Sequence, residues 1–322
     1  MKVLVTGAAG FIGMHCAARL LARGDRVFGV DNLSPYYSVA LKKDRLRQLL
    51  KLKGFRFFAV DMSDKEKFEE IFRKVKPDGV LHLAAQPGVR YALKNPASYI
   101  QANLVAFANL LECCRRRPPR HLVFASSSSV YGNGARLPWA ESADTDHPVS
   151  LYGATKKANE LMAHAYASLH GLAATGLRYF TVYGPWGRPD MSPMLFARAI
   201  LAGKPIAVYN RGDMRRDFTY IDDIVEGTLR VLDRPPAGTP PYALYNIGNH
   251  QPVGLLDYIA ALERALGRKA RTQMKPLQPG DALATCADTS ALAAAVGFAP
   301  ATPLDEGLRR FAEWFRSYYR HG

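Results

Sequence analysis

The chain has 322 residues, of which 48% are hydrophobic and 22% are charged. These proportions are typical of a folded globular protein and exclude a disordered, collagen-like or fibrous chain. No apolar run reaches the roughly 18 residues that a membrane-spanning helix needs, so we expect no membrane partner. The first residues lack the apolar region and cleavage site of a signal peptide, which favours a cytoplasmic location.

Basic residues are in clear excess. The 43 Lys and Arg residues outnumber the 28 Asp and Glu residues and give a formal charge of +15, which favours an anionic partner. The charge is dispersed and no basic motif with interleaved aromatic residues occurs, so we do not expect a nucleic-acid partner. The four cysteines form no Cys-x-x-Cys pair and suit neither a disulfide framework nor a metal site.

The first half of the sequence alternates short apolar segments with segments of helical periodicity, and this order predicts an α/β fold with a parallel, doubly wound sheet. The expected strands are 2–6, 26–30, 55–60, 79–83, 121–125 and 173–178, and the expected helices are 11–22, 41–52, 65–75, 96–116 and 152–170. After residue 180 the strands shorten, and helices are expected at 193–202, 221–233, 255–266 and 304–318. We therefore expect one domain over residues 1–180 and a smaller, mixed α/β part over residues 181–322, interleaved with the first.

A glycine-rich turn, Gly7-Ala-Ala-Gly10-Phe-Ile-Gly13, follows the first expected strand and opens the first expected helix. Glycines at these positions permit a tight turn, close approach of the backbone to a pyrophosphate and close packing of the helix. The helix N-terminus offers free N–H groups to the phosphates. With an acidic residue, Asp31, at the end of the second strand, this pattern predicts a Rossmann dinucleotide site.

Two acidic residues bear on the choice of cofactor. A carboxylate at Asp31 accepts hydrogen bonds from the adenosine ribose hydroxyls and repels a 2′-phosphate, so we expect NAD rather than NADP. Asp61, at the end of the third strand, is a candidate partner for the adenine amine. The alternative interpretation of Asp61 is a cap of the turn that follows it.

Tyr152 and Lys156 are four positions apart on one expected helix and therefore share a face. A phenol has an ordinary pKa near 10, but a neighbouring ammonium favours the phenolate and makes it a better base. Four serines, 126–129, end the fifth expected strand, where ligands of doubly wound sheets bind. A serine hydroxyl there can bridge a sugar hydroxyl and the phenolate.

In this set of motifs the chain resembles the extended short-chain dehydrogenase/reductase family, and within it the nucleotide-sugar epimerases. The shared positions are Gly7-x-x-Gly10-x-x-Gly13, Asp31, Leu81-His-Leu-Ala-Ala85, Ser127, Tyr152-x-x-x-Lys156 and Arg178-Tyr-Phe180. More narrowly, it is similar to epimerases that act on UDP-glucuronate in Asp31-Asn-Leu-Ser-Pro-Tyr-Tyr37, Gln86-Pro-Gly-Val-Arg-Tyr91 and Thr181-Val-Tyr-Gly-Pro-Trp-Gly-Arg-Pro-Asp190. The resemblance spans nearly the whole chain.

The resemblance implies NAD-dependent 4-epimerisation of a UDP-hexuronic acid through a transient 4-keto sugar. It implies that Tyr152 takes the proton from the 4-hydroxyl, that Lys156 lowers the pKa of Tyr152 and holds the nicotinamide ribose, and that Ser127 orients the 4-oxygen. The other implied NAD-binding residues are Gly7, Gly10, Phe11, Ile12, Gly13, Asp31, Asn32, Asp61, Met62, Leu83, Ala84, Ala85, Asn103 and Tyr179.

The resemblance also implies a UDP-sugar site. Its residues are Gln86, Arg90, Ser127, Ser128, Ser129, Thr181, Arg188, Tyr209, Arg216 and Asp281. Among them, Arg216 would grip the diphosphate, Tyr209 would stack on uracil and Asp281 would meet the uridine ribose. Arg188 would close over the substrate.

The choice of sugar is argued from chemistry. Oxidation of glucuronate at C4 makes a β-keto acid that readily loses carbon dioxide. In the family that the chain resembles, dehydratases and decarboxylases carry an acid just after the Ser or Thr of the fifth strand. This chain has no carboxylate after Ser127, so the resemblance implies epimerisation rather than elimination or decarboxylation. We expect the hydroxyls of Ser128, Ser129 and Thr181 to hold the C6 carboxylate.

Two alternatives to this function stay open. They are a UDP-glucose/UDP-galactose 4-epimerase and a non-catalytic NAD-binding regulator. The expected helices 96–116 and 152–170 resemble the pair that forms a four-helix dimer interface in this family, which implies a homodimer.

Overall fold

The computed structural model describes residues 1–133, 136–277 and 283–319. Its centre is a seven-stranded sheet in which every neighbouring pair of strands is parallel, in the order β10-β6-β5-β4-β1-β2-β3. The strands are β1 (Lys2–Thr6), β2 (Arg26–Asp31), β3 (Phe55–Ala59), β4 (Gly79–His82), β5 (His121–Ser127), β6 (Ala174–Tyr179) and β10 (Tyr242–Ile247). The predicted fold class is confirmed.

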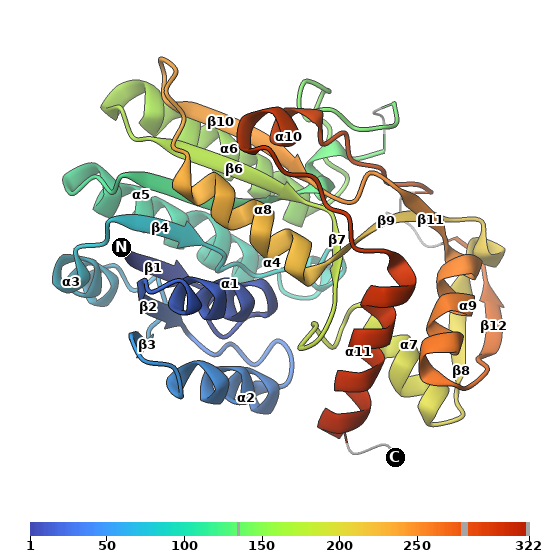
Figure 1. The fold of residues 1–322 in the computed structure, drawn as a ribbon. Coiled ribbons are helices and arrows are strands. Elements are labelled where there is room, and N and C mark those ends of the chain that lie inside the picture. The colour runs from blue at the N-terminus through green and yellow to red at the C-terminus, as the bar shows by residue number, and fades with distance from the viewer. Residues whose placement is uncertain (134–135, 278–282, 320–322) are drawn as a thin grey trace.

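Two buried clusters cover the two faces of this sheet, because successive side chains of a strand point to opposite sides. Val3 and Val5 of β1 belong to one cluster, and Leu4 between them belongs to the other. The first cluster includes side chains of α1 (Phe11–Ala22) and α8 (Ile221–Asp233), which lie side by side in Figure 1. The second includes side chains of α3 (Lys65–Val75), α5 (Ala106–Arg116) and α6 (Leu151–His170). The first half also contains α2 (Val39–Leu50) and the short α4 (Pro96–Tyr99).

The expected helix over residues 96–116 is not one regular helix. It consists of α4 (Pro96–Tyr99), a π-helical segment (Ile100–Val105) and α5, so the single-helix prediction is corrected. Short π-helical stretches are rare and often occur at functional sites. Here the segment carries Asn103, which is 1% exposed and donates to the Gln86 carbonyl at 3.2 Å and to Thr155 Oγ1 at 3.0 Å.

The C-terminal part is smaller and mixed, as predicted. One sheet has the order β11 (Pro252–Gly254), β9 (Arg215–Tyr220) and β7 (Thr181–Tyr183), and the strand β12 (Arg271–Lys275) pairs with β8 (Pro205–Tyr209). The helices are α7 (Ser192–Leu201), α9 (Leu255–Leu266), α10 (Ser290–Val296) and α11 (Leu304–Tyr319), of which α10 has no counterpart in the sequence prediction. Figure 1 shows β8, β12, α7, α9 and α11 beyond the carboxyl ends of the parallel strands.

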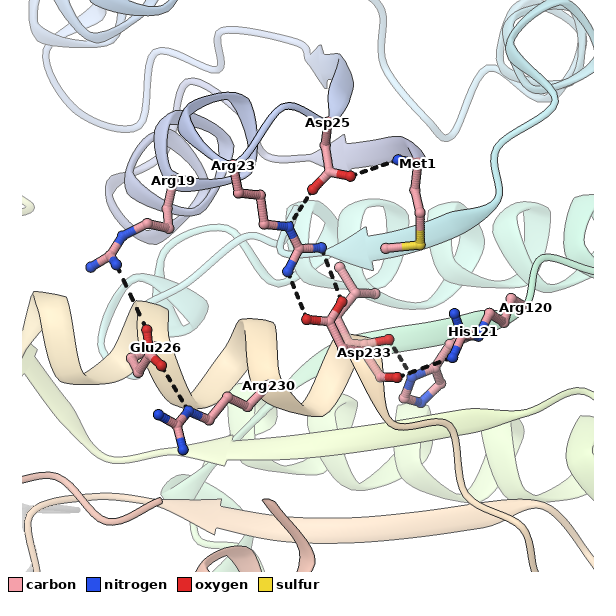
Figure 2. Close-up of polar contacts among 10 residues, drawn as sticks. Met1, Arg19, Arg23, Asp25, Arg120, His121, Glu226, Arg230 and Asp233 are labelled. Carbon is pink, nitrogen blue, oxygen red and sulfur yellow. Dashed lines mark hydrogen bonds and ion pairs between the residues drawn. The ribbon is translucent and has the colours of Figure 1, made fainter. Parts of the chain in front are cut away.

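Two elements from after residue 180 belong with the first half of the chain in space, because one joins its sheet and the other packs on its helices. The strand β10 pairs with β6, and α8 packs on α1. Figure 2 shows how polar contacts tie α8 to the amino end of the sheet. The Arg23 guanidinium binds Asp233 at 2.6 and 2.9 Å, and the Met1 ammonium binds Asp25 at 2.6 Å. The division of the chain at residue 180 stays a prediction.

Among the described residues, no helix is both long and apolar enough to cross a membrane.

Candidate active site

A cavity of about 510 Å³ opens at the carboxyl ends of the parallel strands, where doubly wound folds bind ligands. The structure brings most of the predicted site residues to its wall. They are Gly7, Gly10, Phe11, Ile12, Gly13, Asp31, Asn32, Asp61, Met62, Leu83, Ala84, Ala85, Gln86, Ser127, Ser128, Ser129, Tyr152, Lys156, Tyr179, Thr181 and Arg188. Residues from both halves of the chain thus share one cavity.

The glycine-rich turn passes closer to its neighbours than a side chain would allow. Gly7 has a φ of +70°, and a Cβ there would lie 2.8 Å from the backbone of Leu83 and Ala84. A Cβ on Gly13 would collide with the carbonyl oxygen of Gly7. The N-terminus of α1 has no side-chain cap. The backbone therefore forms an open cradle at a helix N-terminus, which suits a phosphate group.

Asp31 lies beside this cradle and is 9% exposed. Its carboxylate accepts hydrogen bonds from the backbone N–H groups of Ala9 at 3.1 Å and Leu33 at 2.8 Å. Burial raises the pKa of Asp31, while the charge of Lys42 and these two hydrogen bonds act in the opposite direction. A carboxylate has about four lone-pair sites, so Asp31 retains acceptor capacity toward the cavity.

Asp61 has the contacts of a turn cap. Its carboxylate accepts from the backbone N–H and the hydroxyl of Ser63, at 2.8 and 2.7 Å, and from the Asn32 amide at 2.8 Å. Burial alone would raise the pKa of Asp61, but these hydrogen bonds hold it below its ordinary value. Asp61 still lines the cavity, so its role toward adenine stays a prediction.

Tyr152 is half-buried on α6 and hydrogen-bonded to Ser127 of β5. Burial raises its pKa, and the charge of Arg188 and the hydrogen bond with Ser127 oppose that rise. The ring of Tyr99 meets the Tyr152 ring edge-on, with 6.3 Å between the centroids. The positive charge of Arg188 favours the phenolate, which is the form that can accept a proton.

Lys156 is 1% exposed and donates from Nζ to the Ala125 carbonyl at 2.8 Å. Burial lowers its pKa to about 8, and the negative charge of Glu160 acts against that fall. The ammonium form therefore dominates at neutral pH. The cation that lowers the pKa of Tyr152 in this arrangement is Arg188, and the corresponding role of Lys156 stays a prediction.

Hydroxyl groups and cations line the same cavity as Tyr152. Ser127 Oγ donates to Ser129 Oγ at 3.2 Å and accepts from the Ser129 backbone N–H at the same distance. Ser128 and Thr181 line the same cavity. Among the described residues of the cavity wall, the only side-chain carboxylates are those of Asp31, which ends β2, and Asp61, which follows β3. The part of the wall around Tyr152 thus combines positive charge with neutral donors.

The sequence prediction missed how Arg188 is held. Its guanidinium binds Asp190 Oδ2 at 2.6 Å, and the same oxygen accepts from the Tyr36 hydroxyl at 3.0 Å. Both partners lie in segments that carried the family resemblance, and Tyr36 lines the cavity. The segments 31–37 and 181–190 therefore meet at the site, a contact that no local pattern indicates.

Arg45 is a second missed residue, fully buried on α2. Its guanidinium donates to the Trp186 carbonyl at 2.6 Å, the Ala9 carbonyl at 3.1 Å and the Tyr37 hydroxyl at 2.7 Å. It thus joins the glycine-rich turn to the loop that carries Arg188. No sequence motif marks this position.

Five predicted site residues lie outside the cavity wall or outside the described residues. Asn103 instead holds the chain after β4, because its Oδ1 accepts from the Gln86 backbone N–H at 2.8 Å. The Arg90 guanidinium lies 5.7 Å from the centre of the Tyr209 ring. Arg216, on β9, donates to the Arg215 carbonyl at 2.9 Å. Asp281 lies outside the described residues.

Comparison with known proteins connects this site to a family. The family described as "NAD dependent epimerase/dehydratase family" matches residues 3–248. The chain is 46% identical to UDP-glucuronate 4-epimerase 2 of Arabidopsis thaliana, over all of this chain and 77% of that protein. It superposes with a TM-score of 0.92 and 33% identity on a UDP-glucuronic acid 4-epimerase from Bacillus cereus in complex with UDP-glucuronic acid and NAD, over 99% of this chain and 100% of the other.

A second solved structure has nearly the same fold. It is a UDP-glucose 4-epimerase with UDP-glucose from Thermotoga maritima, with a TM-score of 0.90 and 30% identity over 99% of this chain and 100% of the other. The family resemblance inferred from the motifs is confirmed, and the predicted cofactor agrees with the family's description. The chain belongs to the NAD dependent epimerase/dehydratase family.

Proposed function

We propose that this nucleotide-sugar epimerase inverts C4 of UDP-glucuronate to give UDP-galacturonate, with NAD as its cofactor. The observation that carries the proposal is the wall of the cavity that holds Tyr152, to which Ser127, Ser128 and Thr181 contribute hydroxyls and Arg188, paired with Asp190, contributes a cation. Such a wall suits a sugar that bears a carboxylate. The similarity to UDP-glucuronate 4-epimerases from a plant and a bacterium supports the same choice.

The residues present fit NAD. The turn of Gly7, Gly10 and Gly13 leaves backbone exposed where a Cβ would collide, so a pyrophosphate has room at the N-terminus of α1. Asp31 lines the same cavity, and its carboxylate would accept from the ribose hydroxyls and repel a 2′-phosphate. When bound, NAD supplies the hydride acceptor and donor of the reaction.

The chain's own residues handle the proton. Tyr152 takes the proton from the sugar 4-hydroxyl and returns it after the 4-keto sugar has rotated to present its other face. Ser127, which is hydrogen-bonded to Tyr152, orients the 4-oxygen. Lys156 supplies a fixed positive charge in a buried setting, where an opposite charge favours the phenolate more strongly than it would in water.

The carboxylate needs restraint, because the 4-keto form of glucuronate is a β-keto acid. Loss of carbon dioxide requires the C–CO₂ bond to align with the ketone π system. Hydrogen bonds from Ser128, Ser129 and Thr181, each worth about 1.5–3 kcal/mol to a charged acceptor, would hold the carboxylate away from that alignment. Thr181→Ala should therefore release carbon dioxide during turnover, whereas unchanged turnover without release would exclude this role for Thr181.

The direct test is to incubate the purified protein with UDP-glucuronate, without added cofactor, and to follow the sugar by proton NMR. Appearance of UDP-galacturonate supports the proposal and implies that NAD stays bound through purification. If nothing changes, NAD is added and then UDP-glucose is offered. Conversion of UDP-glucose but not of UDP-glucuronate would identify a neutral-sugar epimerase. No conversion of either substrate would favour a non-catalytic NAD-binding regulator.

A homodimer is part of the same proposal. The π-helical segment and α6 pack against each other and expose apolar side chains, with Ile100 40%, Leu161 60% and Leu169 75% exposed. Exposed apolar side chains of this size favour burial against a second copy. Sedimentation at micromolar concentration should give twice the chain mass of 35.5 kDa, and a mass of one chain would contradict the dimer.

A further inference from the structure

Next to the candidate site lies a buried ion pair to which the proposed reaction gives no role. Arg178 of β6 and Glu160 of α6 are 2% and 3% exposed. The guanidinium makes two hydrogen bonds of 2.8 Å to the carboxylate, one to each oxygen. Burying two charges carries a large desolvation cost, and apolar side chains of similar volume often stabilise a fold as well or better. Stability alone therefore does not account for the pair.

The last residues of β5 connect this pair to the proposed catalytic residues. Ser127 hydrogen-bonds Tyr152, and the Ala125 carbonyl accepts from Lys156 at 2.8 Å. Ser126, between them, donates to Glu160 Oε1 at 2.5 Å. Since positions four apart share a face of a helix, α6 presents Tyr152, Lys156 and Glu160 in one row against three successive residues of β5.

In the part of the chain that the structure describes, titratable groups approach Lys156 from its own helix and from two strands of the sheet. From its own helix come Tyr152 and Glu160, and from β4 comes His82, whose pKa burial lowers to about 3 and which is therefore neutral. From β6 comes Arg178, which is paired with Glu160. Burial lowers the pKa of Lys156, and Glu160 is the group that raises it. Glu160 is thus the nearby anion that favours the ammonium form.

The pair also lines a second, smaller cavity of about 330 Å³. The other titratable side chains there are Glu141, Asp144, Asp146, Lys157, His164 and Tyr242. Of these, Asp146 is 75% exposed and pairs with Lys157 at 3.1 Å. Solvent screens such exposed charges, so they act on Lys156 far less than the buried carboxylate of Glu160 does.

We propose that Glu160 and Arg178 are positioning residues, with Glu160 keeping Lys156 in its ammonium form and Arg178 holding the Glu160 carboxylate in place. The proposal deepens the proposed function and rests on the role given there to Lys156. It predicts that removing the Glu160 charge lets burial act unopposed, so that Lys156 loses its proton at lower pH. An opposite charge nearby typically moves a pKa by about 1–3 units.

The test is a pH titration of the whole protein labelled with ¹³Cε-lysine, followed by NMR, with Lys156→Met to assign the signal. Glu160→Gln alone leaves the Arg178 guanidinium buried and unpaired and endangers the fold. We therefore pair it with the double variant Glu160→Gln/Arg178→Gln, which removes both charges. The matched control is Asp146→Asn, which removes an exposed carboxylate from the same small cavity.

We expect the Lys156 midpoint to fall by about one pH unit or more in Glu160→Gln, to fall by less in the double variant, because that variant also loses a cation, and to stay unchanged in Asp146→Asn. The alkaline limb of kcat/KM for UDP-glucuronate should move to lower pH by a similar amount, a change that a merely structural role would not produce. A Lys156 midpoint that is unchanged in every folded variant lacking the Glu160 carboxylate overturns the proposal. If the variants show the midpoint shift but the unsubstituted protein epimerises no UDP-sugar, the proposed function is refuted instead.

Discussion

The two ends of the parallel sheet use charged side chains in opposite ways. At the amino end, Arg23 is 31% exposed and Asp233 is 43% exposed, and they tie α1 to α8 (Figure 2). At the carboxyl end, the side chains of Arg178 and Glu160 are 2% and 3% exposed, and Arg45 is fully buried. The Arg23–Asp233 pair at the amino end is therefore partly in contact with water, whereas Arg178, Glu160 and Arg45 at the carboxyl end are shielded from it.

This difference has a physical consequence for function. Exposed pairs are screened by solvent and salt and contribute little to stability. Buried charges cost more to place, but they act strongly on their neighbours because little water lies between them. Buried charges at the carboxyl ends of the strands are therefore suited to shift a neighbouring pKa or to hold an anion. Substitutions at the carboxyl end should change chemistry and binding, and substitutions at the amino end should change only stability, by small amounts.

The largest effect is expected from Tyr152→Phe. The variant keeps the ring and its edge-on contact with Tyr99 but loses the hydroxyl that moves the proton. The rate should fall by roughly 10²–10⁴-fold, the usual size of a general acid–base contribution. Retained NAD and an unchanged unfolding midpoint serve as controls, measured by absorbance after denaturation and by circular dichroism. Near-full activity would remove Tyr152 from the mechanism.

A smaller but still large effect is expected from Gly13→Ala. The added Cβ meets the Gly7 carbonyl oxygen, so the phosphate cradle must distort and NAD affinity should fall by at least about tenfold, the equivalent of about 1.4 kcal/mol. The matched control is Gly79→Ala at the amino end of β4, where the nearest atom to a Cβ would be Leu232 Cδ1 at an ordinary 3.5 Å. Isothermal titration with NAD compares the two. Equal affinities would contradict the cradle.

Arg188→Gln should have an intermediate effect that depends on the substrate. The variant removes the cation that faces Tyr152 while leaving Asp190 and Tyr36 in place. If Arg188 contacts the sugar carboxylate, loss of one charge-assisted hydrogen bond of about 1.5–3 kcal/mol raises KM for UDP-glucuronate by roughly 10–100-fold. UDP-glucose, which has no carboxylate, should be affected less. Steady-state kinetics with both substrates test this, and an equal change for both would exclude the carboxylate contact.

The elements could be predicted where a local pattern determines them. The bounds expected for 11–22, 65–75, 221–233 and 255–266 match α1, α3, α8 and α9, because each helix has one apolar face toward the core. The π-helical turn at Ile100–Val105 was missed, since i→i+5 pairing has no periodicity that distinguishes it over a single turn. The short, alanine-rich α10 offers too few apolar positions to show a period.

The site residues could likewise be predicted where a local sequence pattern marks them, and not where their role depends on partners far along the chain. The glycine turn, Asp31 and the Tyr152–Lys156 spacing are local patterns with a chemical meaning, and the structure brings those residues to one cavity. Arg45 and Glu160 carry no such mark, because a charged residue on a helix is ordinarily at the surface. Their burial depends on partners far along the chain, such as the Trp186 carbonyl for Arg45.

The smallest effect is expected at the amino end, from Asp233→Asn. Arg23 keeps its other partner, Asp25, and the lost pair is partly exposed, so the free energy of unfolding should fall by only about 0–1 kcal/mol. The loss should shrink at high salt, and epimerase activity should not change. Urea unfolding at low and high salt measures both. At the other end of the sheet, Glu160→Gln leaves a buried guanidinium without its partner and should cost roughly 3–5 kcal/mol. Equal losses for the two variants would contradict the expectation that the buried pair matters more to stability than the exposed one.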